Sequence, residues 1–326
     1  MAKSRKSSVN LALWGDNGHQ IHHQTDKYPR LRPIAFGGFS QELTGALTER
    51  WPESIVCQTF DELLAVPGLE LVSLCSPRRA DQASHTIAAL EAGISVYAEK
   101  PCAVSEPELD LILTAAEKSP AIFHEMAGTV CDQPYWAMRE AVLQGMIGEV
   151  VQILAQKSYP YHERRPTEEA VDGGLIAQNG VHAMRFVEHV SGLRITRIEA
   201  LSTGLGETRP GSDLQMAASL MGTLSNGGVF SAVANYLNPR GFASWGNEML
   251  RLFGTRGMIE AVDGGARTRL IVGSQDHGEL DTGNPAPDWL AAVIAHIADD
   301  RPMPFDLDTE LHPTRMALRA KDKAQV

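Results

Sequence analysis

The feature that most constrains the fold of this chain is a change of rhythm between its two halves. In roughly the first 125 residues, short apolar runs alternate with segments of helical periodicity. The runs expected to form strands are residues 9–14, 34–36, 69–75 and 94–98, with helices after Gly18 and over residues 81–92. Because these runs are apolar on both faces, they predict a parallel sheet flanked by helices, which is an α/β domain.

From about residue 148 the strands become longer, and fewer helices separate them. The expected strands are residues 149–158, 195–202, 215–224, 228–236, 249–253 and 268–272. The Ser-Asn-Gly-Gly sequence at residues 225–228 is typical of a hairpin turn. Two helices are expected in this half, one around residues 182–190 that ends at Ser191-Gly192, the other from 287 or 288 to 298. The second half predicts an α+β domain with a large, mainly antiparallel sheet that is open on one face.

Length and composition set limits on this interpretation. A chain of 326 residues is long enough for two domains, and the change of pattern places the boundary between residues 122 and 150. We divide the chain into residues 1–126 and 127–326. With 43% hydrophobic and 21% charged residues, the chain is not of the disordered class. The absence of an apolar run near ~18 residues predicts no membrane span, and the basic residues 1–8 are expected to be a tail.

Charge and cysteine usage exclude further classes. The net charge is -11 and no basic patch is interleaved with aromatic residues, so nucleic acid is not expected as a partner. The four cysteines are widely spaced and form no CxxC pair, and no His cluster has metal-ligand spacing. We therefore expect no disulfide framework and no metal site, in a protein of the reducing cytoplasm.

A glycine-containing turn follows the first expected strand. In open α/β sheets this turn and the helix after it hold the pyrophosphate of a dinucleotide. The residues expected to contact the cofactor here are Gly15, Asp16, Asn17, Gly18 and His19. The GxGxxG pattern would place glycines at positions 15, 17 and 20, but Asn17 and Gln20 occupy the second and third. The context predicts a doubly wound Rossmann sheet, although the turn alone also fits an α/β domain that binds no nucleotide.

The second expected strand is not followed by the acid that usually binds the ribose hydroxyls. No carboxylate occurs there before Glu42. Ser40, or an arginine such as Arg78 or Arg79, could instead meet a 2′-phosphate. The sequence therefore leaves NAD and NADP both open as the cofactor.

Two later strands of the first half end in polar residues. One is followed by Ser76 and Pro77, and the other by Glu99 and Lys100. Ligands of open α/β sheets bind at the carboxyl ends of the strands, so these four residues are candidates for the cofactor site. A cation beside a hydroxyl that is being oxidised stabilises the developing alkoxide, which makes Lys100 a catalytic candidate. The alternative is a surface lysine at a strand end.

A second motif begins with a glycine pair, Gly173-Gly174, and leads to His182. Residues 178 and 182 are four apart, so on a helix Gln178 and His182 share a face and can reach one substrate. An imidazole titrates near neutral pH and suits proton exchange with a hydroxyl. His182 is therefore a candidate acid or base, unless it is a satisfied histidine of the core.

These segments resemble the glucose-fructose oxidoreductase, inositol dehydrogenase and rhizopine catabolism (Gfo/Idh/MocA) family. Residues 89–101, which end in Glu-Lys-Pro, are similar to the family signature, and residues 141–150 resemble the start of its second domain. The glycine pair and His182 resemble the motif of that domain. The resemblance implies that Lys100 lies between nicotinamide and substrate, and that the loop at residues 159–166, with Tyr161, lies near a sugar.

The chain departs from the family pattern at two positions near His182. Four residues before the histidine, Gln178 replaces the acid that is usual in the family. A glutamine can form hydrogen bonds but cannot take a proton. Three residues after His182, Arg185 replaces the acid that is often found there. Its positive charge suggests an acidic substrate or, as we favour, an ion pair with Glu188 or Glu169. The residues expected to bind substrate are Tyr161, Asn179 and Arg185. The loop at 159–166 either covers the substrate or simply connects two elements.

Together these features predict an NAD(P)-dependent oxidoreductase that acts on a hydroxyl-bearing carbon of a sugar, cyclitol or related small polyol. Lys100 and His182 would handle the proton, with Gln178 beside them. A sensor that binds nucleotide or sugar without turnover is the alternative, because the glycine pattern is incomplete. Redox-neutral chemistry with a bound cofactor is a third possibility. We expect a homo-oligomer, a dimer or tetramer that forms through the second-domain sheet.

Overall fold

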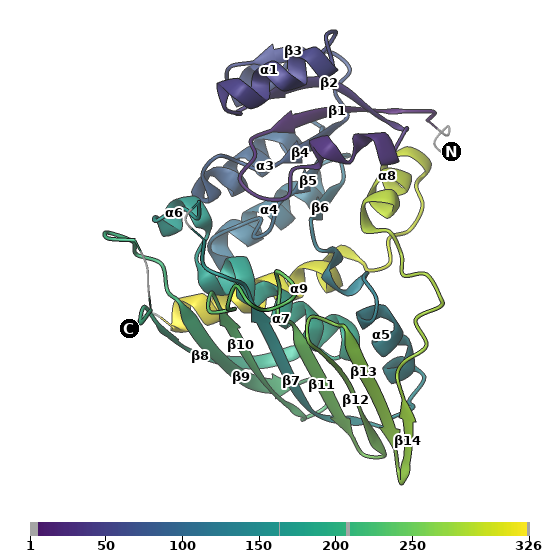
Figure 1. The fold of residues 1–326 in the computed structure, drawn as a ribbon. Coiled ribbons are helices and arrows are strands. Elements are labelled where there is room, and N and C mark those ends of the chain that lie inside the picture. Colours follow the sequence, from purple (N-terminus) through teal and green to yellow (C-terminus); the bar gives the residue numbers. More distant parts are fainter. Residues whose placement is uncertain (1–5, 163, 207–208, 325–326) are drawn as a thin grey trace. The chain divides into compact units, whose positions relative to one another are not determined.

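A computed structural model describes residues 6–162, 164–206 and 209–324, which form two compact units (Figure 1). The first unit comprises the chain up to Ala127 together with Asp288–Leu307, and the second comprises Gly128–Pro287 with the residues from Asp308 onward. The sequence placed all of residues 127–326 in one domain. The structure differs for Asp288–Leu307, which pack with the first unit.

The first unit contains a six-stranded sheet in which every pair of neighbouring strands is parallel. Its order is β3 (Ile55–Cys57), β2 (Leu31–Gly37), β1 (Val9–Trp14), β4 (Leu71–Leu74), β5 (Ser95–Ala98) and β6 (Phe123–Glu125). The connecting helices are α1 (Gln41–Arg50), α2 (Phe60–Leu64), α3 (Gln82–Glu91) and α4 (Glu106–Lys118). Because the order reverses between β1 and β4, right-handed connections place helices on both faces. The predicted doubly wound Rossmann sheet is confirmed.

The helix predicted after Gly18 does not form. Between β1 and β2 the chain makes two short 3₁₀ turns, Ile21–His23 and Thr25–Lys27. Ile21 is the only large aliphatic residue between His19 and Lys27, so this segment has no apolar stripe to bury against the sheet. The prediction was wrong because it followed the position of the turn in the fold and overlooked the polar sequence after it.

Helix α8 (Trp289–Asp299) belongs to the first unit because of specific contacts with that unit. The Trp289 indole N–H donates to the Glu125 carbonyl at the end of β6, over 3.0 Å. Tyr28 donates its hydroxyl to the Asp288 carboxylate, and Arg30 pairs with Asp299 at 2.7 Å. These partners lie far apart in the sequence, so no local pattern could have shown the association.

The second unit is built on an eight-stranded sheet. Its order is β14 (Gln275–Gly278), β13 (Arg267–Val272), β12 (Gly257–Val262), β11 (Met249–Gly254), β7 (Val150–Ser158), β10 (Val229–Asn235), β9 (Ala217–Leu224) and β8 (Ile195–Thr203). All pairs are antiparallel except β7 with β10. The Leu224 N–H donates to the Gly228 carbonyl and closes the predicted hairpin between β9 and β10. The mainly antiparallel sheet is therefore confirmed.

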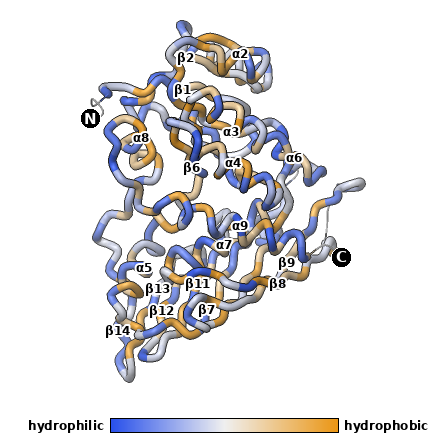
Figure 2. Tube along the Cα trace, turned by 180° about the vertical axis from the view of Figure 1, so that it is seen from behind, coloured by the Kyte–Doolittle hydropathy of each residue, from blue (hydrophilic) through white to orange (hydrophobic). Residues whose placement is uncertain are grey.

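Helices cover one face of this sheet. Figure 1 shows α5 (Tyr135–Leu143), α7 (Val181–Arg185) and α9 (Leu307–Lys323) on the same side of the strands. Hydrophobic positions recur along these strands, interspersed with hydrophilic ones (Figure 2). Buried residues such as Ile153 and Leu252 alternate with exposed large side chains, among them Leu201, Met221 and Val229. The sheet is thus open on one face, as predicted.

Candidate functional site

The turn after β1, residues 15–20, lies where the strand order of the first unit reverses. Gly15 has φ +70°, and a Cβ there would lie 2.1 Å from the Cys75 carbonyl oxygen. Its N–H donates to the Gly37 carbonyl at the end of β2, and the Asn17 N–H donates to Cys75 after β4. The second positive φ of the turn, +133°, falls on Gly18 and not on Asn17. Backbone hydrogen bonds thus hold the turn against the carboxyl ends of two strands, at the edge where such sheets bind ligands.

Gln20 stands in the place of the third glycine of the nucleotide pattern. The side chain is 2% exposed, and its Nε2 donates to the carbonyls of Gly15 at 2.9 Å and Ser73 at 3.1 Å. Its Oε1 accepts from the Ser73 hydroxyl at 2.6 Å and from the Ile21 N–H at 2.9 Å. Because no helix packs here, the amide fits between β1 and β4 and ties them together.

Glu99 holds the turn from the end of β5. Its fully buried carboxylate accepts from the His19 N–H at 2.7 Å and lies 3.0 Å from the His19 ring nitrogen Nδ1. A Cβ on Gly18 would lie 2.5 Å from the Glu99 side chain. Burial raises the pKa of Glu99, but the charge and hydrogen bond of His19, together with Lys100 and Arg79, outweigh it and lower the pKa to about 2. The sequence proposed Glu99 as a cofactor ligand, and the structure shows its carboxylate engaged with the turn.

Lys100 is not a surface lysine. It is 3% exposed, and its ammonium lies 3.8 Å from the Glu99 carboxylate. A buried ammonium requires a counter-charge, which Glu99 supplies. The alternative reading of Lys100 as a solvated residue is therefore wrong, and the chain places a fixed positive charge at the ligand-binding edge.

The remaining candidates of the first unit have varied partners. Ser76 donates its N–H to Gln82 Oε1, and its hydroxyl lies 2.9 Å from His85 Nδ1. Ser40 caps helix α1 by accepting from the Leu43 N–H at 3.2 Å. Arg79 is fully buried and donates to the Asn17 carbonyl, whereas Arg78 is exposed, and a contact of either arginine with a 2′-phosphate stays a prediction.

A dinucleotide fits the carboxyl edge of this sheet. Because Gly15 has no side chain, the backbone of the turn approaches the end of β4 more closely than any other residue would allow. The strand order reverses beside it. The buried ammonium of Lys100 adds a positive charge at the same edge. The pyrophosphate would find fewer backbone donors than in a full Rossmann site, because no helix follows the turn and the His19 N–H is bonded to Glu99.

In the second unit, the glycine pair introduces one long helix. The helix runs from Leu175 to Ser191 and is π-helical at Ile176–Gly180 and Phe186–Val190. Gly174 has φ +85°, and a Cβ there would lie 2.7 Å from the Glu169 carboxyl carbon. π-Helical turns inside helices are frequent at functional sites, and Gln178 lies in the first of them. The helix ends at Ser191, directly before Gly192, as predicted, but begins earlier than residue 182.

His182 is 8% exposed and has a defined environment. Its Nδ1 lies 2.7 Å from the Thr129 hydroxyl, and the Tyr159 ring stands edge-on to it, with ring centroids 6.3 Å apart. Thr129 also lies 3.4 Å from an Arg185 guanidinium nitrogen. Sequence reasoning missed Thr129, because it belongs to no motif and is distant along the chain.

The predicted substrate-binding residues of this unit differ in exposure. Asn179 is fully buried and donates its amide to the Asn235 carbonyl, which anchors the helix to β10. Arg185 is also fully buried. Glu169 pairs with Lys321 and Glu188 with His312, so the proposed Arg185 ion pair stays a prediction. Tyr161 is partly exposed in the loop after β7, and Glu163 of that loop lies outside the described residues.

A second buried ammonium belongs to Lys157, which neighbours the same Tyr159 ring as His182. Lys157, at the end of β7, is 8% exposed, pairs with Glu248, and lies 5.0 Å from the centre of the Tyr159 ring. The signal for it was present in the sequence, because Ile153, Ala155 and Lys157 occupy alternate, inward positions of one strand. This residue was not singled out.

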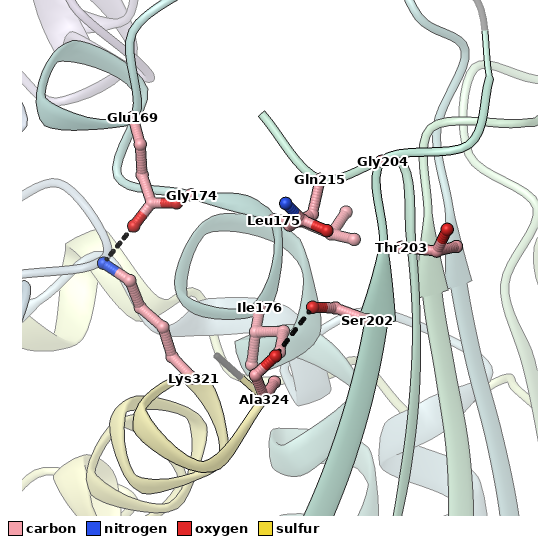
Figure 3. A pocket seen from close by; sticks show the side chains of 10 residues that line it. All are labelled: Glu169, Gly174, Leu175, Ile176, Ser202, Thr203, Gly204, Gln215, Lys321 and Ala324. Atoms are coloured by element: carbon pink, nitrogen blue, oxygen red, sulfur yellow. Dashed lines mark hydrogen bonds and ion pairs between the residues drawn. The ribbon is translucent and has the colours of Figure 1, made fainter. Parts of the chain in front are cut away.

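A polar cavity of about 640 Å³ lies beside the glycine pair (Figure 3). Glu169 and Lys321 form an ion pair at 2.7 Å on one side of it, and the Ser202 hydroxyl donates to the Ala324 carbonyl. Neither His182 nor Gln178 lines this cavity, and its charged side chains already pair with each other. It is therefore a poor candidate for the substrate site.

The part of the chain that the structure describes contains no helix long and apolar enough to cross a bilayer. Within the same residues, no group of three or more His, Cys, Asp or Glu side chains could hold a metal ion.

Comparisons with known proteins give a consistent result. The chain matches the oxidoreductase family with NAD-binding Rossmann fold (GFO/IDH/MocA) at residues 20–126 and the GFO/IDH/MocA C-terminal domain at residues 135–260. D-Glucoside 3-dehydrogenase of Escherichia coli (strain K12) is 26% identical over 196 residues, which are 58% of this chain and 54% of that protein. The chain thus matches about half the length of this relative.

Solved structures are similar over nearly the whole chain. An oxidoreductase from Thermotoga maritima has a TM-score of 0.85 at 20% identity, covering 97% of this chain and 98% of that one. Levoglucosan dehydrogenase, in complex with NADH and levoglucosan, has a TM-score of 0.79 at 15% identity, covering 97% of both chains. At these identities the likeness shows the fold. Because the two family matches together span most of the sequence, the resemblance found in the motifs is confirmed, and the chain belongs to the Gfo/Idh/MocA family of NAD(P)-dependent oxidoreductases.

Proposed function

We propose that this chain is a dehydrogenase that transfers a hydride between nicotinamide and a hydroxyl-bearing carbon of a sugar, cyclitol or related small polyol. The observation that carries the proposal is the buried ammonium of Lys100, held by Glu99 at the carboxyl end of β5. The name of the E. coli relative, D-glucoside 3-dehydrogenase, supports a sugar hydroxyl as the reacting group.

The residues that would hold the cofactor are those that the sequence named. They are Gly15, Asp16, Asn17, Gly18 and His19 of the turn, Ser40 after β2, Ser76 and Pro77 after β4, and Glu99 and Lys100 after β5. NAD or NADP, when bound, supplies the hydride acceptor. Within this set, Glu99 acts through its contacts with His19 and Lys100, as a positioning residue.

We assign the proton transfer to His182 and Lys100. When His182 donates its Nδ1–H to the Thr129 hydroxyl, its Nε2 is the ring nitrogen that carries the lone pair and can take the substrate hydroxyl proton. As hydride leaves the carbon and this proton leaves the oxygen, a carbonyl forms, and Lys100 stabilises the negative charge on the oxygen during the transfer. Gln178 would hydrogen-bond a neighbouring hydroxyl, and Tyr161, Asn179 and Arg185 stay the proposed substrate contacts.

Purified protein tests this proposal directly. It is incubated with NAD⁺ or NADP⁺ and with methyl D-glucopyranoside, D-glucose, myo-inositol or glycerol, and the fluorescence of reduced nicotinamide is followed. We expect reduction with at least one ring-shaped polyol and one of the two cofactors. Absence of NADH and NADPH binding by calorimetry would count against the whole assignment.

A nucleotide- or sugar-binding sensor remains the second candidate, and the turn after β1 favours it. No helix follows that turn, and Glu99 already takes the His19 N–H. A sensor would bind NADH or NADPH with no turnover of any polyol. The redox-neutral alternative predicts a changed substrate without accumulation of reduced nicotinamide, which product chromatography would detect.

We also propose that the protein forms a homo-oligomer, a dimer or tetramer, through the open face of the second-unit sheet. Leu201, Met221 and Val229 are 76%, 61% and 43% exposed on its strands. Exposed apolar side chains on an uncovered face are typical of an interface. Sedimentation of a monomer at micromolar concentration would contradict this. The four cysteines are free thiols, which fits our assignment to the cytoplasm.

A further inference from the structure

A hollow of about 400 Å³ lies between two loops of the second unit, residues 160–162 after β7 and residues 238–245 after β10. Strands β7 and β10 are parallel neighbours, so both loops leave the sheet at the same end. The volume is in the range of small-molecule sites. Aromatic side chains from both loops line it: Tyr161, His162, Phe242 and Trp245.

The hollow is connected to His182 by a series of rings. The Tyr159 ring lies edge-on to His182 at 6.3 Å between centroids, and the Trp245 ring lies 6.3 Å from the same Tyr159 ring with an interplanar angle of 38°. His162 is 5.5 Å from Trp245. Tyr159 thus neighbours both the His182 imidazole and the Trp245 ring that lines the hollow.

The loop that carries Trp245 is held in place. Asn238 is 5% exposed, and its amide nitrogen donates to the Trp245 carbonyl at 2.9 Å and to the Ser244 carbonyl at 3.3 Å. Its N–H donates to the Tyr159 carbonyl, and the Asn247 N–H donates to Ser158. The Asn238 Oδ1 is buried and finds no hydrogen-bond partner among the described residues. These hydrogen bonds fix the backbone of the loop, which lowers the entropy cost of binding a ligand there.

Trp245 is 56% exposed within this hollow. An indole that is left half uncovered offers a flat apolar face, and the charged side chain of Arg240 on the same loop also lines the hollow. A flat face with polar groups beside it suits a six-membered ring that has one apolar face, such as a pyranose or an aryl group.

We propose that this hollow, the Trp245 pocket, binds the second ring of a glycoside whose first ring reacts at His182. The inference rests on the proposed function and narrows its substrate class from any small polyol to a glycoside with two rings. The second ring, a sugar or an aryl group, stacks on Trp245.

The test compares substrates that differ only in the second ring. Methyl β-D-glucopyranoside, phenyl β-D-glucopyranoside and cellobiose are assayed with the wild-type chain, Trp245→Ala, Trp245→Phe and the control Leu237→Ala. Leu237 is 53% exposed on the same loop and does not line the pocket. We expect the wild type to have a higher kcat/KM for a two-ring glycoside than for the methyl glycoside. This preference should fall about tenfold in Trp245→Ala, persist largely in Trp245→Phe and be unchanged in Leu237→Ala.

The outcomes separate this inference from the proposed function. If glucosides are oxidised but the preference is absent, or is the same in Trp245→Ala as in the control, the pocket is overturned and the dehydrogenase stands. If no glucoside is oxidised, calorimetry of phenyl β-D-glucopyranoside and cellobiose decides the pocket alone. About tenfold weaker binding to Trp245→Ala supports it, and equal or undetectable binding to wild type and variant overturns it. If Trp245→Ala lowers kcat/KM or binding for cellobiose but not for the phenyl glucoside, the second ring is a sugar. If it does so only for the phenyl glucoside, the second ring is an aryl group.

Discussion

The turn after β1 and the helix that begins at the glycine pair are the two regions where this chain matches its family by motif, and they have diverged in different ways. In the turn, Asn17 and Gln20 replace two of the expected glycines. The side chain of Gln20 is buried between β1 and β4. In the second region both glycines are present, and a Cβ on Gly174 would lie 2.7 Å from the Glu169 carboxyl carbon. A family glycine can thus be replaced where the neighbouring helix is missing, since that removes the close approach that required it.

The two regions also differ in their charged groups. The turn is surrounded by ionic groups, Glu99, Lys100 and Arg79, that lie close together and are buried. His182 lies against the Thr129 hydroxyl and the Tyr159 ring. We infer that the first region fixes a charge and the second moves a proton, and the following predictions test that division.

The largest effect is expected from Lys100→Met. Removal of the ammonium should lower kcat about 1,000-fold, because a fixed charge no longer stabilises the developing alkoxide, while NADH or NADPH still binds. Steady-state kinetics and calorimetry measure the two quantities. Lys118→Met, on the exposed end of α4, is the matched control and should leave kcat unchanged. Equal kcat values for the two variants would assign Lys100 a purely structural role.

Gln20→Gly should destabilise the protein by about 3 kcal/mol, although it restores the glycine of the nucleotide pattern. The change leaves the buried Ser73 hydroxyl and the Gly15 carbonyl without their partner. Urea unfolding measures the difference, with Gln58→Gly at an exposed position as the control. A variant as stable as the wild type would show that the amide contributes nothing and that the turn tolerates either residue.

Glu99→Gln should cost about 2 kcal/mol near pH 7, and the cost should shrink in acid. The pKa of Glu99 is lowered from 4.5 to about 2 in the folded chain, so ionised Glu99 stabilises the fold above pH 4.5, and this contribution is lost as the pH falls from 4.5 toward 2. Urea unfolding of both proteins at a series of pH values between these limits and neutrality gives the difference. A difference that does not change with pH would contradict the ionised state assigned to Glu99.

Gly174→Ala should cost about 1 to 2 kcal/mol, from the left-handed conformation and the displaced Glu169 side chain. Gly204→Ala, where a Cβ would meet nothing within 4 Å, is the control. Thermal unfolding measures both variants. If they are equally stable, steric crowding does not explain why Gly174 is retained, and the contrast between this region and the turn after β1 is not supported.

The smallest effect is expected from Thr129→Val. The variant keeps its shape but loses the hydroxyl at His182 Nδ1, so kcat should fall about tenfold in steady-state kinetics. Thr129→Ser, which keeps the hydroxyl, should restore kcat. A kcat as low in Thr129→Ser as in Thr129→Val would indicate an effect of packing and not of the hydroxyl.

Local pattern was sufficient for much of the fold. The apolar runs at residues 9–14 and 149–158 coincide closely with β1 and β7, because strands buried in a sheet need continuous or alternating apolar residues. It was not sufficient for α9, where Pro313 and many charged residues obscure a helix that buries Leu311 and Met316. It failed for the helix after Gly18, where position in the fold had been given more weight than the polar sequence.

For the candidate site, the sequence by itself determined which chemical groups are present and on which elements: an ammonium at the end of a parallel strand, an imidazole on a helix after a glycine pair. Only the tertiary structure decided their surroundings. Gln20 bonds Ser73, His19 bonds Glu99 and Tyr28 bonds Asp288, partners that are 53, 80 and 260 positions apart. The periodicity of helices and strands repeats within a few residues and carries no information on contacts at such separations, which form only when the sheets and helices pack.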